Sequence, residues 1–162
     1  MYRTLHLKIL FLFCLLFVVA CGASPTKSGL PVSDEELNTA IDQAQSTMDT
    51  VLHAMLAPKP SYDFLGVKVR FRMPDGASDD NWVELVDYYD GIFTIRMMDG
   101  LTYNTNLHPD RTLDVPEKRV VDWMIVEKDG TLIGGYTIRL AYEHMTPHEQ
   151  KEFLRVTGYK ID

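Results

Sequence analysis

The chain has 162 residues, with 16 lysines and arginines against 23 aspartates and glutamates, which gives a formal net charge of −7. This acidic balance argues against nucleic-acid binding, which needs basic patches, and against electrostatic docking on anionic lipid. The length suffices for one hydrophobic core and therefore predicts a single domain.

The first twenty residues have the pattern of a secretory signal peptide. Arg3 and Lys8 give a positively charged start, and an unbroken apolar run follows from Ile9 to Ala20. A membrane-spanning helix needs about 20 apolar residues, so this run is short for an uncleaved anchor, which is the alternative. It fits the apolar region of a cleavable signal over residues 1–20.

The run ends in Val18-Val19-Ala20-Cys21-Gly22, which resembles the lipobox of bacterial lipoproteins. The resemblance implies cleavage before Cys21, diacylglycerol on its thiol and acylation of the new amine. Two or more acyl chains anchor a protein stably, whereas one binds a membrane only marginally. We therefore predict a lipid-anchored protein of the bacterial cell envelope that faces the periplasm. Gly22, in place of aspartate, favours the outer membrane over the inner.

Removal of residues 1–20 would leave 14 basic against 23 acidic residues, a net charge of −9 before the termini and lipid are counted. Such a charge would attract a basic protein partner, although it is also an ordinary means of staying soluble. Cys21 would be the only cysteine left, so the domain would have neither a disulfide nor a thiol nucleophile. Residues 21–32 are small, polar and proline-rich, which predicts a flexible tether before a domain at 33–162.

An amphipathic helix is predicted to begin after Ser33, because Ser33 and Glu36 have the spacing of a capping box. Apolar residues then recur at steps of three and four until Pro58 ends the pattern. We expect one continuous helix packed on a sheet, with partner binding by this helix as the alternative. The apolar positions are Leu37, Ala40, Ile41, Ala44, Met48, Val51, Leu52 and Met55.

From Phe64 the apolar period changes to two, which predicts strands separated by Asp-Gly turns at positions 75–76, 90–91 and 99–100. After a loop that contains His108 and Pro116, a strand is expected over Arg119–Val126 and another over Thr131–Tyr142. A bulge or close backbone approach is expected at Gly134-Gly135. Thr146, Pro147 and Glu149 begin a short C-terminal helix.

The fold class is therefore α+β: an N-terminal amphipathic helix, a curled antiparallel sheet of five to six strands and a short C-terminal helix. The earlier strands of this meander are expected near residues 64–73, 82–89, 92–98 and 101–104.

The sequence contains no phosphate-binding loop, nucleophile elbow or His-Glu-x-x-His motif, so we predict neither a cofactor nor catalytic residues, and no enzyme. His144 and His148 are four residues apart, but Pro147 between them favours surface histidines over metal ligands. A group of acidic residues is expected to form a solvated edge and not a calcium site. These are Asp79, Asp80, Glu84, Asp87 and Asp90.

Asp122 lies within an otherwise apolar strand, where a buried carboxylate needs hydrogen bonds or a cation. We expect a structural ion pair or an outward-facing side chain in preference to a catalytic acid. The alternative is a small hydrolase in which Asp122 works with His108 or His144. The arginines considered as partners are Arg70, Arg72, Arg96 and Arg139.

Four segments resemble the bacterial family called domain of unknown function 2314, and the resemblance spans about residues 62–153. They are Phe64 to Phe71, Asn81-Trp82-Val83, Asp122-Trp123-Met124 and Gly134-Gly135-Tyr136-Thr137. The sequence departs from the family at Asp80-Asn81, where a Glu-His-like pair is frequent. The family's own function is uncharacterised, so the resemblance implies a self-contained domain and no chemistry.

The aromatic and glycine residues of these segments form either a ligand groove or part of the core, and core packing is the favoured interpretation. They are Trp82, Trp123, Gly134, Gly135 and Tyr136. We expect a non-catalytic binding module for a protein or envelope ligand. One form of it would be an immunity-type inhibitor of a basic toxin that acts in the periplasm.

Overall fold

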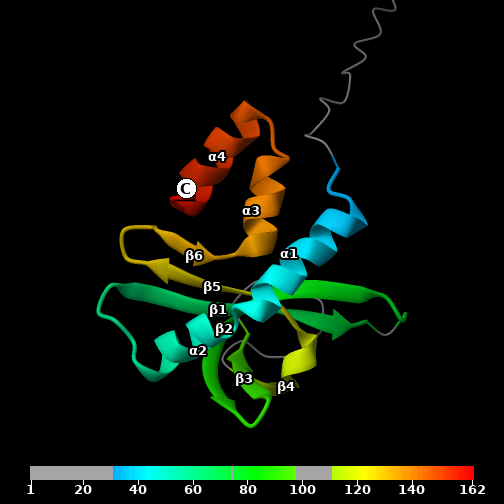
Figure 1. The fold of residues 1–162 in the computed structure, drawn as a ribbon, viewed down its shortest axis with the longest axis vertical. Coiled ribbons are helices and arrows are strands. Elements are labelled where there is room, and N and C mark those ends of the chain that lie inside the picture. Colours follow the sequence, from blue (N-terminus) through cyan, green and yellow to red (C-terminus); the bar gives the residue numbers. More distant parts are fainter. Residues whose placement is uncertain (1–30, 74, 98–110) are drawn as a thin grey trace, which may run out of the picture.

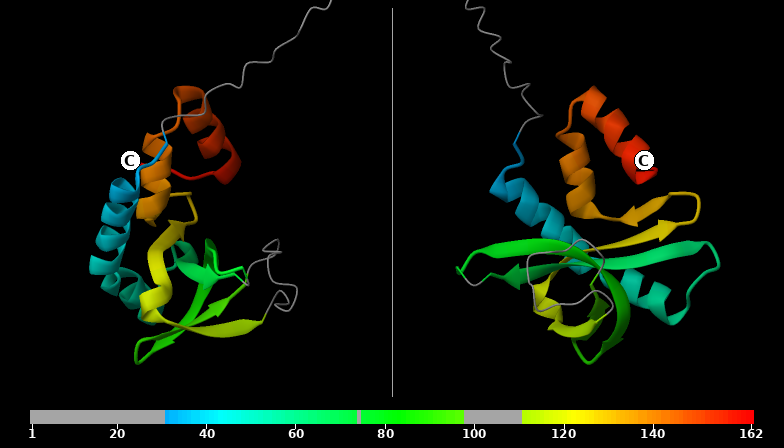
Figure 2. Two further views of the ribbon diagram at one scale, coloured as in Figure 1. Left: turned by 90° about the vertical axis from the view of Figure 1, so that its right-hand side faces the viewer. Right: turned by 180° about the vertical axis from the view of Figure 1, so that it is seen from behind.

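A computed structural model of the protein describes residues 31–73, 75–97 and 111–162. Within these ranges the chain forms a six-stranded antiparallel sheet with helices against one face and at one end (Figures 1 and 2). The predicted α+β class is therefore confirmed. The signal peptide, Cys21, most of the tether, the turn at Asp99-Gly100, the strand predicted over 101–104 and His108 lie outside the described residues.

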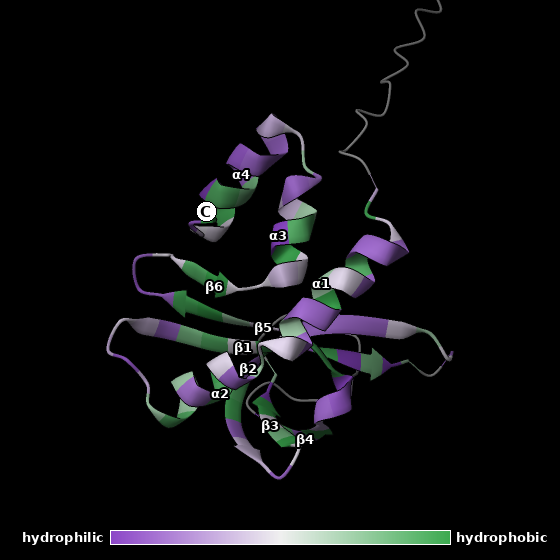
Figure 3. Cartoon of the chain, viewed as in Figure 1, coloured by the Kyte–Doolittle hydropathy of each residue, from purple (hydrophilic) through white to green (hydrophobic). Residues whose placement is uncertain are grey.

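Two helices stand where one was predicted: α1 (Asp34–Ser46) and α2 (Asp49–Leu56). The capping box is confirmed, with the Glu36 N–H 3.3 Å from the Ser33 hydroxyl and the Ser33 N–H 2.9 Å from the Glu36 carboxylate. Figure 3 shows hydrophobic and hydrophilic residues alternating along both helices, as expected for amphipathic elements.

The continuous helix was wrong because a tertiary contact takes one of its carbonyl groups. In an uninterrupted helix the Ala44 carbonyl would accept the Met48 N–H. Here it accepts the indole N–H of Trp123 at 2.9 Å, and the Met48 N–H donates to Gln45 instead. The Thr47 hydroxyl also donates back to the Gln43 carbonyl at 2.8 Å. The helical hydrogen-bond pattern is interrupted at this point, and the buried stripe continues into α2 through Met48, Val51 and Ala54.

The sheet has the strand order β4-β3-β2-β1-β5-β6. Strand β1 pairs with β2 on one side and with β5 on the other, so that Val67 of β1 lies opposite both Val83 and Trp123. The Asp90-Gly91 hairpin is confirmed, and positive φ values of 47° and 76° identify the tight turn that suits the twist of β2 and β3. The strands are β1 (Tyr62–Arg72), β2 (Ser78–Tyr89), β3 (Ile92–Arg96), β4 (Thr112–Pro116), β5 (Val120–Glu127) and β6 (Leu132–Gly134).

Part of the loop predicted before residue 119 is instead β4, which pairs with β3 and buries Val115 opposite Phe93. The prediction relied on Pro116, but this proline is the last residue of an edge strand, a position where a missing N–H is tolerated. A 3₁₀ turn, η1 (Glu117–Arg119), then leads into β5.

The long strand predicted over Thr131–Tyr142 was also wrong. β6 ends at Gly134, and α3 (Tyr136–Glu143) begins after Gly135. Gly134 and Gly135 both have left-handed backbone, with φ of 72° and 64°, which ends the strand and turns the chain. The expected C-terminal helix is confirmed as α4 (Pro147–Thr157), with its capping box between Thr146 and Glu149.

The two faces of the sheet differ in character. The face toward α1 and α2 carries the main core, which includes Trp123, Phe93, Ile95 and Val67. On the opposite face Lys68 lies between Asp122 on β5 and Trp82 on β2. No helix in the described ranges is long and apolar enough to span a bilayer.

The close approach at Gly134 predicts a specific loss of stability in Gly134→Ala. A Cβ atom there would lie 2.6 Å from both the ring and the carbonyl oxygen of Trp123. Gly91→Ala is a matched control, because Gly91 also has positive φ but has nothing within 4 Å of an added Cβ. We expect the control to lose about 1 kcal/mol in urea unfolding and Gly134→Ala to lose about 1–3 kcal/mol more. Equal losses would show that backbone conformation alone requires the glycine.

Candidate functional site

Two of the family-like segments, Asp122-Trp123-Met124 and Gly134-Gly135-Tyr136-Thr137, meet where β5, β6 and α3 join. Gly134 pairs with Met124 as the last residue of β6, and the Gly135 N–H then donates to the Trp123 carbonyl at 2.8 Å. Beyond the end of β6, the first turn of α3 therefore lies beside β5, in the position that a longer β6 would have taken. This places Tyr136 toward the core face, beside Trp123, and Thr137 beside Asp122.

Asp122 is fully buried and caps α3 from a neighbouring strand. One carboxylate oxygen accepts the N–H groups of Trp123 at 2.8 Å and Tyr136 at 3.2 Å. The other accepts the Thr137 N–H and hydroxyl, both at 2.7 Å. Gly135, the N-cap residue, has no side chain to satisfy these donors, and a carboxylate is favourable at the positive end of a helix.

Burial raises the pKa of Asp122, while hydrogen bonds from the Thr137 and Trp123 N–H groups act in the opposite direction. Both the expected arginine ion pair and the outward-facing alternative were wrong for the described residues, because Asp122 is buried and N–H groups of β5 and α3 satisfy its carboxylate. Arg70 and Arg96 pair with Asp80 and Glu84. Arg139 instead donates to the carbonyls of Leu132 and Gly134.

Lys68 lies opposite Asp122 on the same face of the sheet and is linked to its carboxylate through the Thr137 hydroxyl. Its ammonium group donates to the Thr137 hydroxyl at 3.1 Å, and that hydroxyl donates to Asp122. The same ammonium lies 5.9 Å from the centre of the Trp82 ring, within range of a cation–π contact. The hydroxyl thus links a cation to the carboxylate without a direct ion pair.

Trp123 joins α1, β5 and α3 through one side chain. It is 2% exposed, its indole N–H reaches the Ala44 carbonyl, and its ring packs edge-on to Tyr136 at 6.0 Å between centroids. The Tyr136 hydroxyl lies 2.9 Å from the Thr47 hydroxyl oxygen, to which it can donate. Of the five residues predicted as groove or core, four pack within this junction, namely Trp123, Gly134, Gly135 and Tyr136, and Trp82 lies on the opposite face of the sheet from Trp123.

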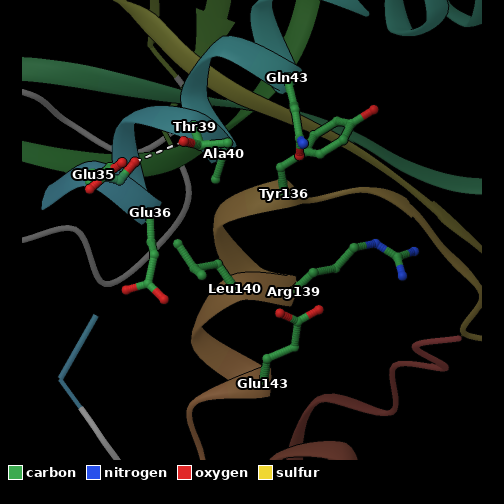
Figure 4. A pocket seen from close by; sticks show the side chains of 9 residues that line it. All are labelled: Glu35, Glu36, Thr39, Ala40, Gln43, Tyr136, Arg139, Leu140 and Glu143. Atoms are coloured by element: carbon green, nitrogen blue, oxygen red, sulfur yellow. Dashed lines mark hydrogen bonds between the residues drawn. The ribbon is translucent and has the colours of Figure 1, made fainter. Parts of the chain in front are cut away.

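Tyr136 also lines a groove of about 550 Å³ between α1 and α3 (Figure 4). Ala40 and Leu140 face each other across it, and Tyr136 lies near Gln43 at one end. The charged lining residues are Glu35, Glu36, Glu143 and Arg139.

The electrostatic character of this groove is negative. The Arg139 guanidinium is engaged by the carbonyl groups of β6 and turns away from α1 (Figure 4). A hydrogen bond from the Ser33 side chain lowers the pKa of Glu36, which also lies 3.2 Å from His144. Three carboxylates therefore border an apolar floor.

Sequence reasoning missed the groove because it assigned residues 131–142 to a strand. A helical signal was present, since Tyr136, Arg139, Leu140 and Glu143 recur at steps of three, one and three, which places them on one helix face. The β-branched and aromatic residues of this segment favoured the strand instead.

His144 does not converge with Asp122 in the way the hydrolase alternative requires. It follows the last residue of α3, seven residues from Thr137, or about 10 Å along the helix axis at 1.5 Å per residue. The acidic group around β2 is also dispersed, with Asp80 and Glu84 paired to arginines and Asp90 in the hairpin turn. Over residues 31–73, 75–97 and 111–162, no three His, Cys, Asp or Glu residues are placed to hold a metal ion.

Comparison with protein families identifies a match over residues 34–161 to the family described as "Uncharacterized protein conserved in bacteria (DUF2314)". The chain belongs to this family. The match begins at α1 and continues past α4, so both sides of the α1–α3 groove belong to the DUF2314 domain. No curated protein and no solved structure matches the chain.

Replacement of Asp122 by asparagine tests the cap. Both carboxylate oxygens of Asp122 now accept hydrogen bonds. In Asp122→Asn one of these oxygens is replaced by an amide NH₂ group, which cannot accept from the donors that face it. A buried N–H left without an acceptor costs about 1–3 kcal/mol, and we expect this loss in chemical unfolding together with faster hydrogen exchange at Thr137. Asp114→Asn is the control, since Asp114 also accepts from a threonine hydroxyl but is exposed. The control should change stability by less than about 0.5 kcal/mol. Equal effects of the two substitutions would contradict the capping role.

Proposed function

We propose that this DUF2314 protein is a lipid-anchored binding module of the bacterial cell envelope, which holds a basic segment of a protein partner in the α1–α3 groove. The single observation that carries the proposal is the combination of an apolar floor with a carboxylate border in that groove. The overall charge of −9 predicted for the mature chain adds long-range attraction for a basic partner.

The groove has dimensions and chemistry suited to lysine and arginine side chains. Its volume of about 550 Å³ lies within the range of roughly 300–1,000 Å³ for ligand-binding clefts. The aliphatic part of a lysine or arginine can pack on Ala40 and Leu140, while its charged end reaches Glu35 or Glu143. The apolar contact supplies affinity, and the carboxylates select the charge of the ligand.

The predicted anchor would confine this binding to the membrane surface. Residues 21–32 span at most about 40 Å when fully extended, at 3.3–3.6 Å per residue. The domain would therefore remain close to the lipid, on the periplasmic side and preferably at the outer membrane. Inhibition of a basic toxin that crosses this space is one form that such binding could take.

A hydrolase receives less support. Asp122 is sealed in the interior and accepts four hydrogen bonds, so it has no open position from which to exchange a proton with a substrate. The binding interpretation is therefore preferred.

The anchor is tested by Cys21→Ala. We expect the variant to lose labelling by a fatty-acid analogue and to accumulate as the longer precursor, because both acylation and cleavage depend on this cysteine. Ser28→Ala in the predicted tether is the control and should retain the lipid. Unchanged labelling of Cys21→Ala would exclude this cysteine as the attachment site.

The groove is tested by photo-crosslinking in intact cells, with a photoreactive phenylalanine analogue in place of Gln43 inside the groove or Asp42 outside it. We expect an adduct with a basic protein from position 43 and none from position 42. The double substitution Glu35→Gln with Glu143→Gln should reduce the adduct several-fold, since it removes two of the attracting charges.

The matched control is Asp42→Asn with Asp49→Asn, which removes two charges from exposed positions that do not line the groove. This control should leave the adduct unchanged. The proposal fails if the two positions give the same adducts, or if the groove and control doubles reduce the adduct equally.

A further inference from the structure

A second hollow of about 300 Å³ has the opposite charge to the α1–α3 groove. It is lined by Arg70 and Arg72 of β1, Ser78 of β2, and Lys118 and Arg119 of η1. Four cationic side chains around one hollow are unexpected in a chain of net charge −7, where acidic residues outnumber basic ones. This hollow was not predicted from the sequence, because its members come from three separate segments.

The fold assembles the hollow where β1 extends past β5. The last pair between these strands is Val69 with Val120, so Arg70 to Arg72 run beyond the start of β5. η1 directly precedes β5 and lies beside this extension; it is the yellow helical turn after β4 in Figure 1. Arg70 and Arg72 are two residues apart on β1 and thus point to the same face. Ser78 lies opposite Arg72 in the β1–β2 register.

Three of the four cations have no carboxylate partner within the described parts of the chain. Arg70 is held by Asp80 through two hydrogen bonds of 2.8 and 2.9 Å, which neutralise it and fix its guanidinium. The salt bridges of these parts include neither Arg72, Lys118 nor Arg119. Like charges that share a hollow repel one another, and an anion bound between them would remove that repulsion.

We propose that this hollow binds a phosphate monoester. Arg72 and Arg119 supply planar guanidinium groups that can each donate two hydrogen bonds to an oxyanion, Lys118 adds a point charge, and Ser78 adds a hydroxyl donor. A phosphate monoester has a second pKa of about 6 and therefore carries a charge of about −1.5 to −2 near neutral pH. The three uncompensated positive charges of the hollow are sufficient to balance it. The site is independent of the α1–α3 groove and does not rest on the function proposed for it.

The surroundings restrict the ligand to a small phosphate-bearing group. A nucleic acid would bring a row of phosphates against a surface rich in carboxylates, so its binding would be opposed outside the hollow. A volume of about 300 Å³ is at the lower end of ligand-binding clefts, with room for the ester-linked part as well as the phosphate. The same chemistry is offered by a soluble phosphate ester and by a phosphomonoester lipid headgroup.

The test measures binding of two probes to the mature-length protein at about 150 mM salt. One probe is glycerol 3-phosphate, followed by calorimetry, and the other is a phosphatidylcholine vesicle with or without phosphatidic acid, followed by co-sedimentation. The pocket variant is Lys118→Gln with Arg119→Gln, and the control is Lys128→Gln with Lys151→Gln, which removes the same charge from exposed positions elsewhere. Thermal unfolding confirms that both variants fold.

We expect saturable one-to-one binding of at least one probe, weakened about tenfold or more in the pocket variant and unchanged in the control. Binding of glycerol 3-phosphate identifies a soluble ester as sufficient, and binding of phosphatidic acid vesicles alone identifies the lipid headgroup. The proposal is overturned if neither probe binds, or if the pocket and control variants weaken binding equally, since that would indicate general electrostatic attraction.

Discussion

The carboxylate of Asp122 determines how the C-terminal third of the chain is attached to the sheet. It satisfies the first N–H groups of α3 in a position where Gly135 has no side chain to do so. Because a buried, unsatisfied N–H is costly, α3 can begin only where this carboxylate is available. The start of α3 in turn positions Tyr136 and Leu140 against α1, and that contact creates the groove.

Trp123, the next residue along β5, makes the complementary connection on the other face of the sheet. Its indole N–H donates to the Ala44 carbonyl in the place of the Met48 N–H, and its ring and carbonyl oxygen leave no room for a Cβ atom at position 134. Consecutive residues of β5 thus hold two neighbouring helices, since Asp122 accepts from the start of α3 and Trp123 donates to the end of α1. The Asp-Trp-Met and Gly-Gly-Tyr-Thr segments are therefore parts of one structural junction.

The two hollows give the domain separate regions of opposite charge. The groove between α1 and α3 is bordered by three glutamates, and the hollow beside η1 is lined by four cations. Under the two proposals made above, the hollow beside η1 would bind a phosphate monoester and the α1–α3 groove a basic segment of a protein partner. Each region has charges drawn from different elements, so neither is visible in the net charge of −7.

Local features could be predicted from the residues alone: both capping boxes, the Asp90-Gly91 hairpin, the strand with period two after Phe64 and the α+β class. These depend on residues that are neighbours in the chain, and short-range hydrogen bonding or alternation suffices to specify them. Sequence alone also supports the predicted lipid attachment at Cys21, which lies outside the described residues.

Other features follow from long-range contacts in the folded chain: the break at Thr47, the replacement of a strand by α3, the partners of Asp122 and the two charged hollows. Each depends on groups far apart in sequence, such as the indole of Trp123 and the carbonyl of Ala44, 79 residues away. A local pattern records what a segment prefers in isolation, whereas a buried donor or acceptor must be satisfied by whichever group the fold brings to it.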